Sequence, residues 1–135
     1  MNQINVIIEK TNTGYSAYSP DVPGCIATGE NVSEIKEQFA GALEFHIEGI
    51  KEDGETMAEA LQGEYTLYFT IDLPTFFSWM DGVMTKTGIA NIAEMNRDLI
   101  NHYANGRRTP SQKQLFKIET ALHKLGHDLL GVQLG

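Results

Sequence analysis

Hydrophobic and polar residues alternate near the beginning and near the end of the first half of the chain. Ile4, Val6 and Ile8 occupy every second position, which is the period of a strand that buries one face. A turn at residues 11–14 follows, so the next short alternating run is expected to pair with the first as a hairpin. In all, the pattern predicts four strands: residues 4–8, 15–18, 25–29 and 65–72.

A helical period separates the third strand from the fourth. Its apolar positions recur every three or four residues: Ile35, Phe39, Leu43, Ile47 and Ile50. Asn31 or Ser33 can cap the start of this helix, and the pattern predicts about four turns that end between Gly49 and Gly54. The order strand-strand-strand-helix-strand describes an α+β domain of about seventy residues.

The second half has no strand pattern after Pro74, a residue that suits the first turn of a helix. Its apolar residues instead predict five short helices, which begin near residues 74, 85, 96, 111 and 127. Capping side chains precede three of them: Thr85 or Thr87, Asn96, and Ser111. Gly126 is expected to end the fourth helix and to separate it from the last short turn. Short, closely connected helices of this kind are typical of a helix-turn-helix bundle.

The charge distribution changes where the hydrophobic pattern changes, and we therefore predict two domains, residues 1–72 and residues 73–135. The formal net charge of −8 conceals this division. The first part has three lysines against thirteen carboxylates, a net charge of −10, whereas the second has seven basic residues against five acidic ones, a net charge of +2. Within residues 85–118 the net charge is +4. The acidic part is expected to meet a cationic partner, and the second part can approach phosphates.

Composition narrows the class of protein further. A chain of 135 residues with 41% hydrophobic and 21% charged residues resembles a globular protein and not a disordered or collagenous one. Cys25 is the only cysteine, which excludes an intrachain disulfide framework and a cysteine-rich zinc site. No apolar run approaches the ~20 residues of a membrane span, and the first residues lack the features of a signal peptide. We expect a cytoplasmic protein without membrane association, metal or cofactor.

Two segments of the sequence resemble known protein families. The segment YSAYSPDVPGC at residues 15–25 resembles the signature hairpin of HicB-family antitoxins, and Gly29-Glu30 with the helix at residues 32–50 continues the resemblance. Residues 85–110 resemble the operator-binding helices of lambda-repressor-like proteins, which are often appended to HicB domains. Together the two resemblances cover nearly the whole chain.

The resemblance implies a truncated ribonuclease-H-like sheet that lacks nuclease activity. It also implies a protein that neutralises a small basic RNA-cleaving toxin of the HicA type and represses its own operon. The residues expected to contact the toxin belong to the hairpin: Tyr15, Tyr18, Pro20 and Asp21. The chain departs from the lambda-repressor-like pattern at Glu94, where glycine is usual. Because a non-glycine residue at positive φ costs on the order of 1 kcal/mol, a wider turn is expected there.

The predicted helix at residues 97–105 carries side chains that can read DNA. Arginine can hold guanine through two donors and asparagine can hold adenine in the same way, so Arg97 and Asn101 are the predicted base readers. Asp98 would repel phosphate unless it accepts from cytosine, and Thr87 can donate to a phosphate at a helix start. The same residues would also suit the solvated face of an ordinary bundle. The predicted DNA-binding residues are Thr87, Arg97, Asp98, Asn101, His102, Arg107, Arg108 and Lys113.

Two other functions are compatible with the sequence. A metal-dependent nuclease needs carboxylates around two cations about 4 Å apart, and Asp21, Glu44 and Glu48 are available, although a solvated acidic surface is the commoner explanation. An orphan helix-turn-helix regulator would use its first domain for oligomerisation or ligand binding. The preferred hypothesis is a non-enzymatic regulator that binds a HicA-like toxin and double-stranded operator DNA. It would act as a homodimer or a higher even-numbered oligomer, because operators are usually read as paired half-sites.

Overall fold

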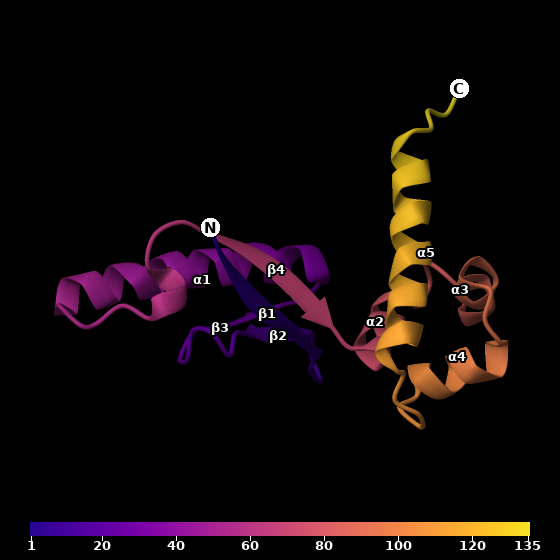
Figure 1. Ribbon diagram of the computed structural model, residues 1–135, viewed down its shortest axis with the longest axis horizontal. Helices are drawn as coiled ribbons and strands as arrows, with labels where there is room; N and C mark the ends of the chain where they lie inside the picture. Colours follow the sequence, from indigo (N-terminus) through magenta and orange to yellow (C-terminus); the bar gives the residue numbers. More distant parts are fainter. The chain divides into compact units, whose positions relative to one another are not determined.

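A four-stranded sheet and one long helix form the first part of the chain (Figure 1). The computed structural model describes all residues from 1 to 135. Contacts within the chain divide it into two units, Met1–Asp72 and Leu73–Gly135.

The sheet of the first unit is mixed. Its strands are β1 (Asn2–Lys10), β2 (Tyr15–Tyr18), β3 (Ile26–Gly29) and β4 (Tyr65–Ile71), in the order β3-β2-β1-β4. β1 pairs antiparallel with β2 through its residues Ile7 to Lys10. It pairs parallel with β4 through its residues Asn2 to Ile8. A parallel pair needs a crossover connection, and helix α1 supplies it. The four predicted strands and the α+β class are thereby confirmed.

Helix α1 (Val32–Asp53) begins at Asn31, whose side-chain oxygen accepts from the Glu34 backbone N–H at 2.8 Å. It ends at Gly54, which has a φ of 67° and donates its backbone N–H to carbonyl groups of the last turn. With 22 residues the helix has about six turns, so the predicted length of about four turns is wrong. Gly49 weakens a helix but does not end it when flanking turns remain packed, and of Gly41, Gly49 and Gly54 only Gly54 adopts the left-handed conformation.

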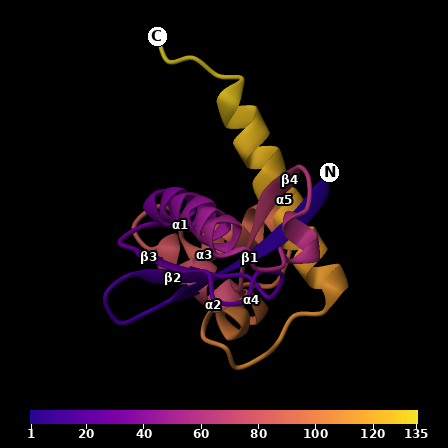
Figure 2. The same ribbon diagram turned by 90° about the vertical axis from the view of Figure 1, so that its left-hand side faces the viewer.

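The core of the first unit lies between α1 and one face of the sheet (Figures 1 and 2). Phe39 and Leu43 of α1 are fully buried, as are Ile4 and Val6 of β1. The intervening strand residues point to the opposite face, where Tyr68 is 48% exposed. The first unit is therefore a two-layer structure whose second sheet face is accessible.

The second unit consists of four helices. These are α2 (Leu73–Trp79), α3 (Lys86–Ala93), α4 (Arg97–Ala104) and α5 (Gln112–Leu130). Its fully buried residues include Ile89 of α3, Ile100 of α4 and Ile118 of α5. The expectation of five helices is wrong, because Gly126 lies inside α5 and the last predicted turn is the end of the same helix.

The second half of α5 extends past the other helices of its unit (Figure 1). The helix continues through Gly126 because the apolar period is maintained on both sides of it, at Leu122 and Leu129. Leu129 is 63% exposed and Leu130 is 89% exposed. None of the helices in either unit combines the length and the apolar composition needed to cross a membrane.

Candidate functional site

Helices α3 and α4 follow one another across a short turn, and each of them begins at a capping side chain. Thr85 caps α3, because its hydroxyl oxygen accepts from the Gly88 N–H at 2.9 Å. Asn96 caps α4 in the same way, by accepting from the Asp98 N–H at 2.8 Å. Of the two predicted caps for α3, Thr85 is therefore the one used, and Thr87 lies exposed in the first turn.

Glu94 adopts the left-handed conformation, with φ 55° and ψ 47°, and ends α3. It is the only non-glycine residue in the chain with a positive φ. The expectation of a wider turn is therefore wrong: the chain keeps the left-handed turn and accepts the strain. The carbonyl oxygen of Glu94 accepts from the Lys117 ammonium at 3.2 Å, which helps to hold the turn against α5.

We expect Glu94→Gly to stabilise the second unit by about 1 kcal/mol, because glycine has no Cβ to strain at positive φ. Urea denaturation of the purified protein measures this effect. Glu94→Ala is the matched control, since it removes the same carboxylate but keeps the Cβ, and it should bring no comparable gain. Equal midpoints for the two variants would contradict the strain argument.

Helix α4 separates its apolar side from its polar side. Ile100 and Tyr103 are buried against the unit. The four candidate residues lie on the other side: Arg97 and Asp98 are exposed, whereas Asn101 and His102 are half-buried. The cap at Asn96 puts Arg97 in the first turn, where the N-terminal end of a recognition helix meets base edges in helix-turn-helix complexes.

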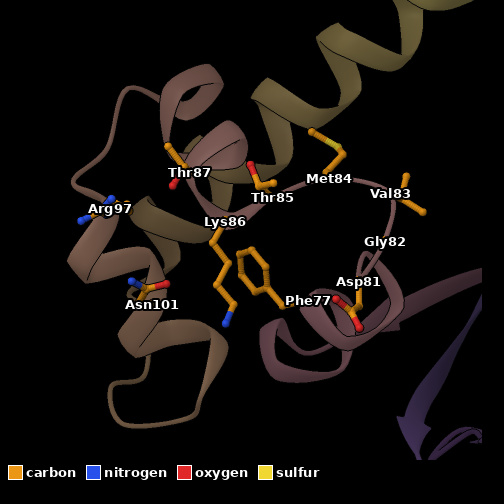
Figure 3. A pocket seen from close by; sticks show the side chains of 10 residues that line it. All are labelled: Phe77, Asp81, Gly82, Val83, Met84, Thr85, Lys86, Thr87, Arg97 and Asn101. Carbon is orange, nitrogen blue, oxygen red and sulfur yellow. The ribbon is translucent and has the colours of Figure 1, made fainter.

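A recess of about 580 Å³ opens beside the starts of α3 and α4 (Figure 3). Its lining includes apolar side chains, two cationic side chains, one carboxylate and several neutral polar groups. The lining residues are Phe77, Asp81, Gly82, Val83, Met84, Thr85, Lys86, Thr87, Arg97 and Asn101. Three predicted DNA-binding residues, Thr87, Arg97 and Asn101, thus border the same hollow.

Lys86 is a candidate that the sequence reasoning did not select. It is exposed, it follows the Thr85 cap directly, and its side chain extends from the first turn of α3 into the recess (Figure 3). The first backbone N–H groups of a helix have no partner within the helix, so a cation there adds to a site that already attracts anions. The sequence signal that could have identified Lys86 is the capping residue Thr85, because the cap fixes which residues occupy the first turn of α3.

The remaining cationic candidates lie on the connection between α4 and α5 and just after it. Arg107, Arg108 and Lys113 are all exposed. The Arg107 backbone N–H donates to the Asn105 side chain at 3.1 Å, which orders the loop and leaves the guanidinium free to reach outward. The structure does not place these three residues on the lining of the recess.

The hairpin residues of the first unit divide into buried and exposed members. Tyr15 is only 6% exposed and belongs to the core, so its selection as a toxin-contacting residue is wrong. Tyr15 lies at an inward-facing position of β2, so its ring belongs to the core between the sheet and α1. Tyr18, Pro20 and Asp21 are exposed. The Asp21 carboxylate accepts from the Asn5 backbone N–H at 2.9 Å and therefore also holds the loop against β1.

Three side chains of this unit have raised pKa values: Tyr18, Cys25 and Tyr65. Burial is the main cause of the raised pKa of the Tyr65 hydroxyl, and the charges of Glu44 and Cys25 contribute less. The charge of Glu9 raises the pKa of the Tyr18 hydroxyl, with smaller contributions from desolvation and from their hydrogen bond of 3.3 Å. Burial raises the pKa of the Cys25 thiol, which is 3% exposed. All three shifts favour the protonated form at neutral pH, and a buried protonated thiol is a poor nucleophile.

The carboxylates proposed for a nuclease are not arranged as a metal site. No group of three or more His, Cys, Asp or Glu side chains in the chain could hold a metal ion together. Asp21, Glu44 and Glu48 therefore do not form the convergent set that two-metal chemistry needs.

Comparisons with known proteins concern the first unit most directly. The family model described as "HicB_like antitoxin of bacterial toxin-antitoxin system" matches residues 4–67. The chain is 32% identical over 50 residues to the "UPF0150 protein" of Helicobacter pylori, which covers 37% of this chain and 69% of that protein. It is 44% identical over 55 residues to the "Uncharacterized 14.9 kDa protein in rep-hol intergenic region" of Haemophilus phage HP1, which is 41% of each chain.

A solved structure, the "HicA3 and HicB3 toxin-antitoxin complex", is also similar, with 31% identity and a TM-score of 0.37. The match covers 38% of this chain and 60% of that one. The present chain thus spans less than half of the phage relative and three-fifths of the matched chain of the complex.

The first unit is a small two-layer α+β domain with a net charge of −10, and a helical unit follows it. The chain belongs to the HicB-like antitoxins of bacterial toxin–antitoxin systems, and residues 4–67 form the HicB-like domain.

Proposed function

We propose that this protein is a non-enzymatic antitoxin that binds a small basic RNA-cleaving toxin of the HicA type through residues 1–72 and its own operator DNA through residues 73–135. The observation that carries the proposal is the division of charge at the boundary between the units. The first unit, which contains the antitoxin family match, has a net charge of −10, and the second has +2, with +4 over residues 85–118. Opposite potentials steer each unit toward a partner of opposite charge.

The DNA-binding part of the proposal rests on the geometry of α3 and α4. In this proposal the two helices form a helix-turn-helix, α4 enters the major groove, and Arg97 and Asn101 read base edges. Asp98 and His102 lie next to them on the same side of α4. Phosphates would be bound at the start of α3 by Lys86 and Thr87.

Phosphates on the other side of the groove would be bound by Arg107, Arg108 and Lys113. These three residues are exposed at the α4–α5 connection and at the start of α5. Lys113 lies in the first turn of α5, where the helix dipole disfavours a cation. The position of Lys113 therefore does not favour the stability of α5, but it would suit the binding of an external anion such as a phosphate.

We expect residues 1–72, expressed alone, to bind the cognate toxin and to suppress its cleavage of RNA. The unit has its own hydrophobic core and holds the acidic surface that would attract a basic partner. Toxin-dependent degradation of a labelled RNA, with residues 73–135 as the matched control fragment, measures the effect. Protection by the control fragment instead of by residues 1–72 would contradict the assignment.

An orphan transcriptional regulator is the alternative in this family context. Its first unit would serve oligomerisation, for which the free edge of β4 and the exposed face around Tyr68 offer a surface. The same experiment separates the two functions, because an orphan regulator would bind operator DNA and would leave a basic RNA-cleaving neighbour fully active.

A further inference from the structure

The solvent side of α1 carries one large apolar side chain that the fold does not use. Phe45 is 79% exposed, whereas Phe39 and Leu43 of the same helix are fully buried. Positions four apart lie in one row along a helix, so Gly41 and Gly49 stand one turn before and one turn after Phe45. We call this row, with the neighbouring carboxylates, the Phe45 face: Glu37, Gly41, Glu44, Phe45, Glu48 and Gly49.

The two glycines of the Phe45 face have no role in internal packing. A Cβ added at Gly41 or at Gly49 would meet nothing within 4 Å. Both glycines lie inside α1, in the helical conformation, where glycine lowers stability relative to alanine. What they do provide is a low surface on either side of the Phe45 ring, so that another molecule can approach the helix closely.

The carboxylates of the Phe45 face form no ion pair within the molecule. Glu37, Glu44 and Glu48 are exposed and form no ion pair, since the ion pair of the chain joins Lys124 to Asp128. Two of the three lysines of this unit are engaged with rings of their own unit: Lys10 lies 4.9 Å from the centre of Tyr15, and Lys36 lies 5.4 Å from the centre of Phe69.

We propose that the Phe45 face is the surface on which the basic toxin docks, with the Phe45 ring entering an apolar socket and the three carboxylates facing lysines or arginines of the toxin. This inference rests on the proposed function and names where the partner binds. Aromatic anchors that fill a pocket near the centre of an interface often contribute much of its binding energy. Charge complementarity selects a cationic protein as the occupant.

The accessible face of the sheet is the competing surface, and the carboxylates of Glu9 and Asp21 there are hydrogen-bonded within the unit. It carries Ile26, which is 66% exposed, and Tyr18. The carboxylate of Glu9 accepts from the Tyr18 hydroxyl, and that of Asp21 accepts from the backbone N–H of Asn5. These hydrogen bonds leave both carboxylates charged, but they occupy acceptor positions that the exposed carboxylates of the Phe45 face keep open for a basic partner.

The test uses the full chain and, as probe, the small basic protein encoded by the adjacent reading frame, with binding followed by calorimetry. Phe45→Ala should weaken binding at least tenfold and leave the unfolding midpoint unchanged or higher, because the ring is exposed. Ile26→Ala is the matched control, an exposed apolar residue on the sheet face, and it should bind within about twofold of the wild type.

Substitution of the glycines gives a signature that a purely structural role would not produce. Gly41→Gln and Gly49→Gln should each raise the midpoint of unfolding, since glutamine is a better helix former than glycine, and should weaken toxin binding by about tenfold or more. Glu44→Gln with Glu48→Gln should reduce the salt dependence of binding, whereas Glu55→Gln, which lies beyond the end of α1, should not.

The outcomes separate this inference from the proposed function. If the wild-type chain does not bind the basic neighbour at all, the proposed function is wrong and the docking surface falls with it. If the wild type binds and Phe45→Ala binds equally well while Ile26→Ala is impaired, the toxin docks on the sheet, and only the inference about α1 is overturned.

Discussion

Arg97→Ala is expected to weaken binding to operator DNA by ~1–3 kcal/mol, or roughly five- to 150-fold. The reason is the loss of a two-donor contact to a guanine, made from the first turn of α4. Asn101→Ala should lose a similar amount if its amide holds an adenine. Binding to random DNA should change far less, because non-specific affinity comes mainly from phosphates. Arg97 is exposed, so the unfolding midpoint should stay where it is.

The matched controls are Arg107→Ala and Arg108→Ala, which remove the same charge from the α4–α5 connection. Either change should weaken binding to operator and to random DNA alike, and should reduce the slope of log affinity against log salt by about one. Titrations of all four variants on both DNAs at several salt concentrations measure the difference. If Arg97→Ala and Arg107→Ala lose equally on the two DNAs, α4 is not the element that reads bases.

The second large effect concerns assembly. We expect the chain to bind its operator as a dimer through the second half of α5, where Leu122 and Leu125 are half-buried and Leu129 is exposed on the same side of the helix. Replacing Leu125 and Leu129 together by Asp should yield monomers in sedimentation. Because two linked reading units gain ~10²–10⁴ in affinity over one, operator binding should fall by about 10²-fold or more.

Tyr68→Asp provides the control for this experiment. It puts the same charge on the accessible sheet face, which is the other candidate surface for self-association, and it should leave the dimer intact. Loss of the dimer in Tyr68→Asp alone would move the interface to the sheet. Monomers that still bind the operator tightly would contradict the requirement for paired half-sites.

The elements that the sequence predicts well are those whose signal is local. The alternation of β1 and β4 depends on neighbouring residues only. The same holds for the helix caps at Asn31, Asn96 and Ser111, and the structure has these strands and caps at the expected positions. Glycine was the misleading residue. Gly54 ends α1 at a positive φ, whereas Gly49 and Gly126 continue their helices. Which of these a glycine does depends on packing that the sequence does not display.

The candidate DNA residues of α4 could be proposed from sequence because a cap fixes the phase of a helix, and the phase decides which side chains face outward. The burial of Tyr15 could not be predicted from the sequence. Alternation divides the residues of a strand between two faces but does not say which face α1 covers. Glu94 is a similar case. Residue type alone predicts that a glutamate avoids positive φ. Here the packing of the surrounding helices imposes that conformation, and its free energy exceeds the cost of the strain.

The parallel pairing of β1 with β4 also determines the order in which the first unit can be completed. Tyr65 pairs opposite Asn2, and Ile71 opposite Ile8, so the strand that finishes the sheet is made last, after the whole of α1. The hairpin of β1 and β2 needs only neighbouring residues and can form early, but pairs so distant in sequence form slowly. A chain still on the ribosome therefore holds one edge of β1 open until about residue 71 has emerged. During that interval an unpaired strand edge can recruit other chains, which makes the completion of β4 the step that protects a newly made molecule from aggregation.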